Sequence, residues 1–200
     1  MKKARKFSGG VFVLLLMFSV IGLQSGYAAE KSAVFDAHDT GIRYHFTDTD
    51  MDFNFGTLVL GATVNHGVEI GEAFYAASQI KDGDAASWQK EWFLLAQRVE
   101  ARGLQSLAEG HKVSARDQLQ RASYYYRISL LAILPTDSRL AERAEKSRSL
   151  MKKAGELYDP PMEYIEIPYE GTVMPGYFRK AANSDKPAKT LIMIGGGETF

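Results

Sequence analysis

The chain has 200 residues, of which 46% are hydrophobic, 12% aromatic and 24% charged. This composition is typical of a globular protein and excludes a collagen-like or disordered chain. Cysteine is absent, which excludes a fold held together by disulfides. The formal net charge is zero and no basic block follows the first residues, so nothing in the charge pattern favours a nucleic-acid partner.

Residues 1–29 have the layout of a secretory signal peptide. The basic start "MKKARK" precedes a 13-residue apolar run, Val11 to Leu23, and then small residues that end at Ala28 and Ala29. A membrane span needs about 20 apolar residues, so we predict cleavage and export to a periplasm or beyond rather than an uncleaved anchor. After cleavage we expect no stable membrane span. The mature chain would have 20 basic and 24 acidic residues, a net charge of −4.

Residues 30–158 are predicted to form a helical domain. The first part, to about residue 80, favours coil and short helices. Trp88, Trp92, Leu95 and Val99 then recur at spacings of 4, 3 and 4, which predicts a helix over 85–108 with Asp84 as its N-cap.

Two further helices are expected in this domain. The second follows Gly110, continues through Ile133 and ends at Pro135, because proline cannot continue a helix. The third is capped by Asp137 and runs to about Ala154.

Several side chains in this domain could be structural or functional. We expect Trp88, Trp92 and Tyr124–Tyr126 to be mainly core residues, with a substrate-facing wall as the alternative. The four histidines, His38, His45, His66 and His111, lack the spacing of a helical zinc site. "DTDMD" at 48–52 begins like a calcium loop but has Phe53 and Val59 where glycine and glutamate are needed, so a solvated turn is expected. Solvated helix faces are also expected at five charged residues: Glu100, Arg102, Arg116, Asp117 and Arg121.

At residue 159 the pattern changes from helical to alternating, and we place a domain boundary there, with 159–200 starting an α/β domain. The alternation in "YIEIPY", residues 164–169, predicts a strand, "EGT" a turn, and "VMPGYFRKA" a second strand that proline confines to an edge. "TLIMI", residues 190–194, is apolar on both faces, which is typical of a central strand covered by helices.

The glycine run at 195–197 follows this third predicted strand. A dinucleotide fingerprint would need glycine where Phe200 stands, and a Walker loop would need Gly-Lys-Ser/Thr, which is absent. Two interpretations remain from the residues, a plain strand-to-helix turn and an oxyanion loop whose backbone N–H groups stabilise developing negative charge.

The wider sequence resembles one family. The helical segments "DGDAASWQKEWFLLAQRVEARG" and "SARDQLQRASYYYRISL" precede "IPYEGT", "PGYF" and "GGGET" in this order. This arrangement resembles α/β-hydrolases with a helical N-terminal domain, the group that contains 2,6-dihydroxypseudooxynicotine hydrolase and fermentation-respiration-switch type esterases. The resemblance extends over roughly Asp52 to Thr199.

The resemblance implies an α/β-hydrolase fold, with a helical cap domain followed by the first strands of a mixed, mainly parallel sheet. Such enzymes use a serine on a G-x-S-x-G turn, followed by an acid and a histidine. No serine here stands in that setting, so we expect the triad to lie beyond Phe200. The catalytic candidates in the chain are then the backbone N–H groups of Gly196, Gly197 and Glu198.

The expected function is therefore the N-terminal part of an exported serine hydrolase, inactive alone, that acts on a small carbonyl substrate such as an ester, amide or activated carbon–carbon bond. No cofactor or metal is implied, and a homodimer is possible in this family. The alternative is a helical peptide-binding module without catalysis, although no 34-residue self-repeat is found.

Overall fold

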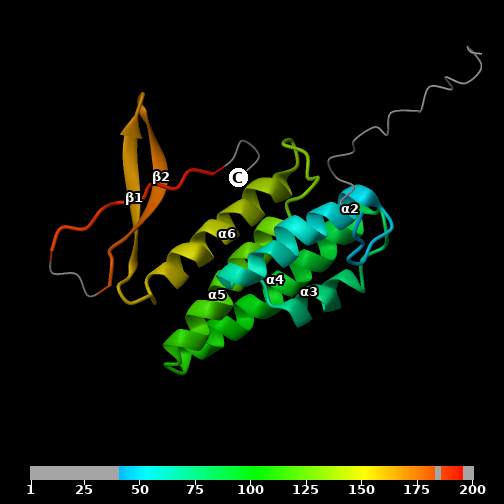
Figure 1. Cartoon of the computed structure of the whole chain (residues 1–200), viewed down its shortest axis with the longest axis horizontal. Coiled ribbons are helices and arrows are strands. Elements are labelled where there is room, and N and C mark those ends of the chain that lie inside the picture. The colour runs from blue at the N-terminus through cyan, green and yellow to red at the C-terminus, as the bar shows by residue number, and fades with distance from the viewer. Residues whose placement is uncertain (1–40, 183–185, 196–200) are drawn as a thin grey trace, which may run out of the picture. The chain divides into compact units, whose positions relative to one another are not determined.

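A computed structural model of the chain describes residues 41–182 and 186–195 (Figure 1). The predicted signal peptide at 1–29 lies outside these described residues. Among the helices of the described ranges, none is long and apolar enough to cross a membrane.

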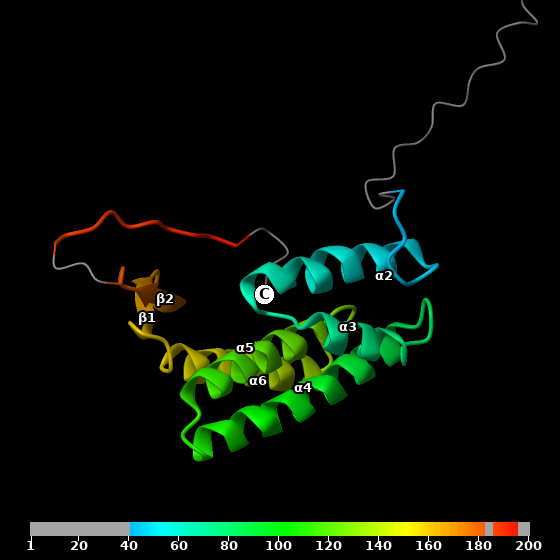
Figure 2. The same ribbon diagram turned by 60° about the horizontal axis from the view of Figure 1, so that its bottom comes forward.

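The described part begins with three consecutive helical segments, seen in cyan in Figure 2. They are α2 (Thr49–Asn54), the π-helical η1 (Phe55–Val59) and the 3-10 helical η2 (Leu60–Asn65). Asp48 caps the start, because its side chain accepts a hydrogen bond from the Met51 N–H. The run ends at His66, whose φ of 63° is in the left-handed region. The expectation of short helices in this part of the chain is confirmed.

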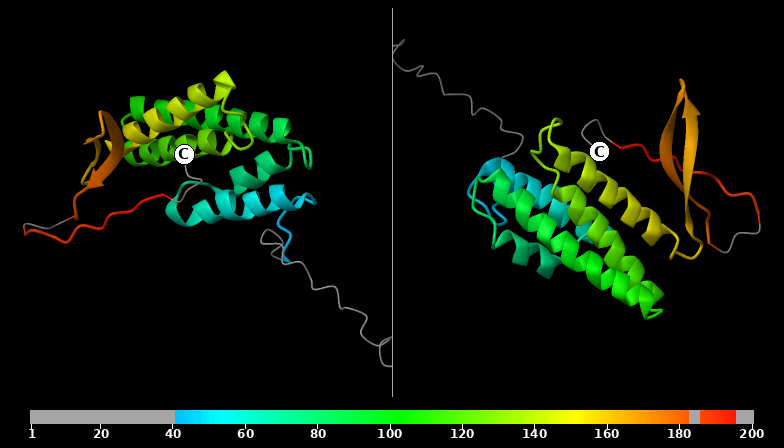
Figure 3. Two further views of the ribbon diagram at one scale, coloured as in Figure 1. Left: turned by 90° about the horizontal axis from the view of Figure 1, so that it is seen from above. Right: turned by 180° about the vertical axis from the view of Figure 1, so that it is seen from behind.

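Four helices follow: α3 (Ile70–Ala77), α4 (Ala85–Ala108), α5 (Lys112–Ile128) and α6 (Ser138–Gly155). Asp84 and Asp137 cap α4 and α6 as predicted, and both helices have the expected bounds. α5 packs against α4 on one side and α6 on another, and the views in Figure 3 show the three long helices side by side.

The prediction that the second long helix continues through Ile133 is wrong, because α5 ends at Ile128. The carbonyl of Ser129 accepts a hydrogen bond from Arg143 Nη1 at 3.2 Å, while the Ile133 N–H bonds the nearer carbonyl of Leu130. The guanidinium of Arg143 on α6 therefore binds the Ser129 carbonyl, which in a longer α5 would accept the Ile133 N–H. Pro135 comes too late to be the cause.

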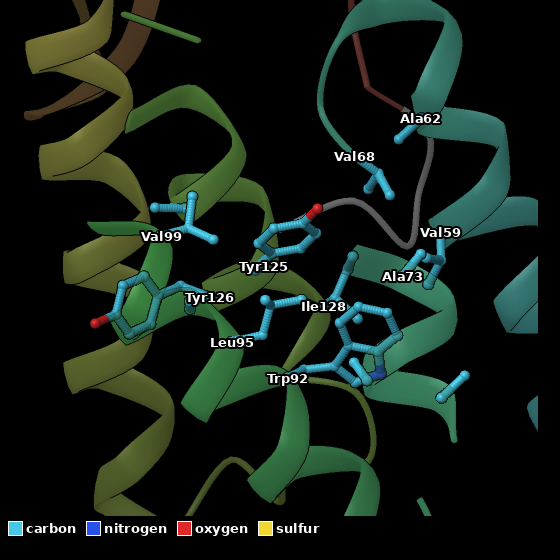
Figure 4. Packing of buried hydrophobic residues seen from close by; sticks show 14 of the residues in the cluster. Val59, Ala62, Val68, Ala73, Trp92, Leu95, Val99, Tyr125, Tyr126 and Ile128 are labelled. Atoms are coloured by element: carbon cyan, nitrogen blue, oxygen red, sulfur yellow. The ribbon is translucent and has the colours of Figure 1, made fainter. Parts of the chain in front are cut away.

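The core lies between these helices and is rich in aromatic rings (Figure 4). Trp88, Trp92, Tyr125 and Tyr126 are all buried, which confirms the prediction that they are core residues, whereas Tyr124 is partly buried and packs against this core. The indole of Trp92 stacks on the ring of Tyr125 with their centroids 5.9 Å apart. The Trp88 indole N–H donates to the carbonyl of Ile128 at 3.1 Å, so this polar atom is satisfied inside the core.

The chain then forms an antiparallel hairpin of β1 (Met162–Tyr169) and β2 (Thr172–Arg179). Tyr169 pairs with Thr172, which leaves Glu170 and Gly171 as a two-residue turn with φ angles of 44° and 80°. Two positive φ angles give the turn the twist that a tight hairpin needs. The two predicted strands are confirmed, and so is a turn between them, although Thr172 of the predicted "EGT" turn belongs to β2.

The third predicted strand is not formed. Thr190–Ile194 is extended without strand pairing, and its four large apolar side chains, Leu191 to Ile194, are 79 to 88% exposed. The sheet of the described residues contains β1 and β2 alone. A strand that is apolar on both faces is stable only between neighbouring strands and covering helices, and in the described residues the hairpin does not pair with it. The glycine run reached through this segment begins at Gly195, the last residue described.

Candidate functional site

The predicted catalytic groups, the backbone N–H groups of Gly196, Gly197 and Glu198, lie outside the described residues. The oxyanion-loop interpretation therefore stays a prediction. The two clusters of charged and tyrosine side chains described next lie among the helices α3 to α6.

One cluster joins α3 to α4 and α5, and we call it the Glu72 cluster: Glu72, Arg102, Arg121 and Tyr125. The Glu72 carboxylate forms an ion pair with Arg102 through Oε1 and with Arg121 Nε through Oε2, the latter at 3.3 Å. Its Oε2 also accepts a hydrogen bond from the Tyr125 hydroxyl at 2.9 Å. A single carboxylate thus holds two guanidinium groups and a phenol from two helices.

The tyrosine of this cluster is fully engaged. Its hydroxyl oxygen accepts a hydrogen bond from the Glu69 backbone N–H at 3.0 Å, and the same hydroxyl donates a hydrogen bond to Glu72 Oε2. Burial raises the pKa of Tyr125 well above its usual range, and the neighbouring carboxylate acts in the same direction. The phenol therefore stays protonated at neutral pH, and its chemistry is that of a structural hydrogen bond.

A second cluster lies along a groove of about 290 Å³ between α4, α5 and α6. Glu100 accepts hydrogen bonds from the Tyr126 hydroxyl at 2.6 Å and from Lys146 Nζ at 2.8 Å. Burial, followed by the hydrogen bond to Glu100, raises the pKa of Tyr126. The ring of Phe93 forms one wall, and the Arg143 guanidinium lies 4.3 Å from its centroid. Both oxygens of Glu100 are occupied, so this carboxylate holds three helices together.

These two clusters correct the expectation of solvated helix faces. Arg121 is 19% exposed with a buried Nε, and Glu100 is 15% exposed, whereas Arg102 at 53% fits the prediction. Arg116 and Asp117 pair with each other at 2.7 Å. The partners of Arg121 and Glu100 lie on other helices, so local spacing contained no signal for these contacts.

The histidines of the described part are separate from one another. His45 packs edge-on against Phe46 with the ring centroids 4.7 Å apart, and His66 ends η2. His111 precedes α5, with its Nδ1 3.4 Å from Glu109 Oε2. His38 lies outside the described residues. Within 41–182 and 186–195, no three His, Asp or Glu side chains gather as metal ligands would.

The acidic run at 48–52 forms the cap and the first residues of α2, and the prediction of a solvated turn is wrong at Asp52. This carboxylate is buried and accepts hydrogen bonds from the backbone N–H groups of Tyr44, His45 and Phe46, the shortest at 2.8 Å. Burial raises the pKa of Asp52, but the three backbone donors outweigh it and the net shift is downward. Asp82 holds the next two N–H groups, those of Thr47 and Asp48, at 3.0 and 3.1 Å.

Comparison with known proteins places the chain among hydrolases. It is 33% identical over 153 residues to the hydrolase ORFZ of Pyricularia oryzae, a match that covers 72% of this chain and 36% of that protein. It is 34% identical over 140 residues to the α/β-hydrolase pydG of an Acremonium species, covering 69% of this chain and 33% of that protein.

The chain belongs to the α/β-hydrolase family. The resemblance inferred from the helical segments and the strand-and-glycine order is thereby confirmed. No family model matches this α/β-hydrolase chain. It spans about one third of the length of the curated relatives it matches. A solved structure, that of 2,6-dihydroxy-pseudo-oxynicotine hydrolase, aligns at 26% identity with a TM-score of 0.49, covering 59% of this chain and 32% of that one.

Proposed function

We propose that this chain is the helical cap and the first strands of an exported serine hydrolase that acts on a carbonyl carbon. The observation that carries the proposal is the match to proteins named hydrolases over about 70% of the chain. The helical residues and the hairpin follow one another in the order that the family resemblance implies. The substrate would be a small ester, amide or activated carbon–carbon bond.

In the proposed reaction a serine attacks the carbonyl carbon, and negative charge develops on the carbonyl oxygen. Gly196, Gly197 and Glu198 would contribute a backbone N–H group to stabilise this charge, which is worth about 3 to 4 kcal/mol when the donor is preorganised. The sequence contains no G-x-S-x-G, so the serine, its acid and its histidine are proposed to come from a part of the hydrolase outside these 200 residues.

The test of the reaction is labelling with a fluorophosphonate, a probe that reacts with activated serines. The protein expressed from its complete reading frame should be labelled, and hydrolysis of p-nitrophenyl esters should be lost in step with labelling. The 200-residue chain alone should not react. An unlabelled complete protein would refute the serine-hydrolase proposal.

The oxyanion role has its own variants. Gly197→Pro removes one backbone N–H and, where that N–H is the donor, should lower kcat about 100- to 1000-fold. Glu198→Gln keeps every backbone N–H and should leave kcat within about twofold, since no side-chain chemistry is proposed for it. A large loss in Glu198→Gln would show that the carboxylate itself takes part.

Export is part of the same proposal. Cleavage after Ala28 or Ala29 would give a mature protein whose intact mass lacks residues 1–28 or 1–29. Recovery of the protein outside the cytoplasm with Met1 still attached would contradict the cleavage and favour an anchor.

A further inference from the structure

The passage from the helices to the hairpin contains a stacked joint centred on Tyr158. Figure 3 shows the chain passing from the end of α6 into β1. In this passage the ring of Tyr158 lies between two guanidinium groups, Arg116 of α5 at 4.8 Å and Arg179 of β2 at 4.5 Å from its centroid. One aromatic ring therefore connects a residue of a helix with a residue of a strand 63 positions further along the chain (179 − 116 = 63).

Hydrogen bonds hold Tyr158 and Arg179 in place. The Tyr158 hydroxyl donates to the side-chain oxygen of Gln120 on α5. Arg179 donates from Nε to the Pro160 carbonyl at 3.2 Å and from Nη2 to the Asp159 carbonyl at 3.3 Å. The strand end is thus tied to the loop that leads into β1, and the loop to α5.

Two closer contacts lie beside the stack. A methyl group at Gly155, the last residue of α6, would come within 3.1 Å of both Cε and the carbonyl oxygen of Met162, so helix and strand approach as closely as glycine allows. Lys152 Nζ lies 4.7 Å from the ring centroid of Tyr164 on β1. Only residues 156–161 connect α6 to β1, and the contacts around them are what can hold the hairpin in one orientation.

We propose that Tyr158 is a positioning residue: it holds the β1–β2 hairpin in one orientation on α5 and α6, and so sets where the helical domain lies over the hydrolase site. The second half of this inference rests on the proposed function. The first half concerns the chain alone. Tyr158 touches no reacting atom in this scheme and acts through the orientation of the two parts.

The orientation can be measured directly, because the chain has no cysteine. Spin labels on Ala141→Cys of α6 and Thr172→Cys of β2, both exposed, report the distance between helices and hairpin. We expect one narrow distance distribution in the parent chain and a clearly broader one in Tyr158→Ala. Tyr158→Phe keeps both cation–π contacts and should broaden it less. An unchanged distribution in Tyr158→Ala would overturn the proposal.

The matched control is Tyr75→Ala. Tyr75 also stacks with an arginine, Arg98 at 5.3 Å, but this pair joins α3 to α4 and does not involve the hairpin. The control should leave the distance distribution narrow. Broadening in both variants to the same extent would mean that loss of any such stack loosens the chain, and would also overturn the assignment.

The consequence for catalysis is tested in the protein from the complete reading frame. Tyr158→Ala should raise KM about three- to tenfold with kcat within about twofold, since substrate alignment under the helical domain weakens while the reacting groups are intact. Equal KM values for parent and variant would refute the catalytic half. Absence of fluorophosphonate labelling in the parent would refute the proposed function instead, while the distance measurement would still decide the joint.

Discussion

Gly103 on α4 lies against Leu119 on α5, and replacement of this glycine tests how tightly the two helices pack. A methyl group added at Gly103 would lie 2.9 Å from Leu119 Cδ2, 3.0 Å from Cγ and 3.2 Å from the backbone nitrogen. Unstrained carbon contacts are about 3.5 to 4.0 Å, and Leu119 is fully buried, so it cannot turn aside. The backbones themselves would have to separate.

The magnitude follows from two opposing effects. Replacing glycine by alanine inside a helix stabilises by about 1 kcal/mol through backbone entropy. Overpacking a tight core costs about 1 to 3 kcal/mol. Because backbone is among the clashing atoms, we expect the overpacking to dominate and Gly103→Ala to lower the free energy of unfolding by about 1 kcal/mol.

The decisive test repeats Gly103→Ala in a protein that already carries Leu119→Ala. Alone, Leu119→Ala should cost about 3 kcal/mol, as for other large-to-small core changes. In its presence the clash disappears, so Gly103→Ala should become stabilising by about 1 kcal/mol, a coupling of about 2 kcal/mol between the two positions. The free energies come from urea unfolding followed by fluorescence of the buried Trp88 and Trp92.

The control is Ala101→Gly at an exposed position of the same helix, which should lose about 1 kcal/mol from propensity alone. Should Gly103→Ala instead stabilise the parent by the same amount, and add to Leu119→Ala without coupling, the close approach of α4 and α5 would be disproved.

Two further predictions concern the polar groups of the helical part. Asp52→Asn should lose about 1 to 3 kcal/mol of unfolding free energy at pH 7, because the amide cannot accept three N–H groups equally. The native pKa of Asp52 is lowered, so its carboxylate stabilises above the unfolded pKa of about 3.9, and this contribution is lost as the pH falls through the native pKa. The gap between parent and variant should therefore narrow in urea unfolding at pH 3, and a gap that is constant with pH would contradict this. Tyr125→Phe should cost about 1 to 2 kcal/mol, since it leaves the Glu69 N–H without its acceptor and removes one hydrogen bond to the Glu72 carboxylate, which keeps Arg102 and Arg121. The exposed Tyr75→Phe should change stability by less than about 0.5 kcal/mol, and equal losses in the two variants would argue against a special role for the Tyr125 hydroxyl.

Local patterns predicted much of the helical part. The apolar spacing from Trp88 to Val99 and the capping residues Asp84 and Asp137 place α4 and α6 correctly, because helix period and N-caps are encoded within a few residues. The prediction of where α5 ends was wrong for the opposite reason. It depends on Arg143 reaching the Ser129 carbonyl from another helix, and no local pattern encodes that contact.

The charged residues show the same division. A run such as "DTDMD" appears solvated in sequence, yet Asp52 is buried because three consecutive N–H groups turn toward it. Arg121 and Glu100 are likewise mostly buried, because they bind partners on other helices. Burial of a charge depends on what surrounds it in space, so it follows from the packing and cannot be derived from the residue and its neighbours alone.

The sequence by itself determined the starts of the three long helices, the two strands of the hairpin with a turn between them, and the α/β-hydrolase resemblance, since each rests on periodicity, capping or the order of short segments. Tertiary structure alone decided where α5 ends, which charges are buried and how Tyr158 joins helix to strand, because these depend on atoms brought together from distant parts of the chain. The segment Thr190–Ile194 lies between the two cases. Its composition is that of a central strand, but a strand forms only where partners supply its hydrogen bonds, and in the described residues it has no paired strand.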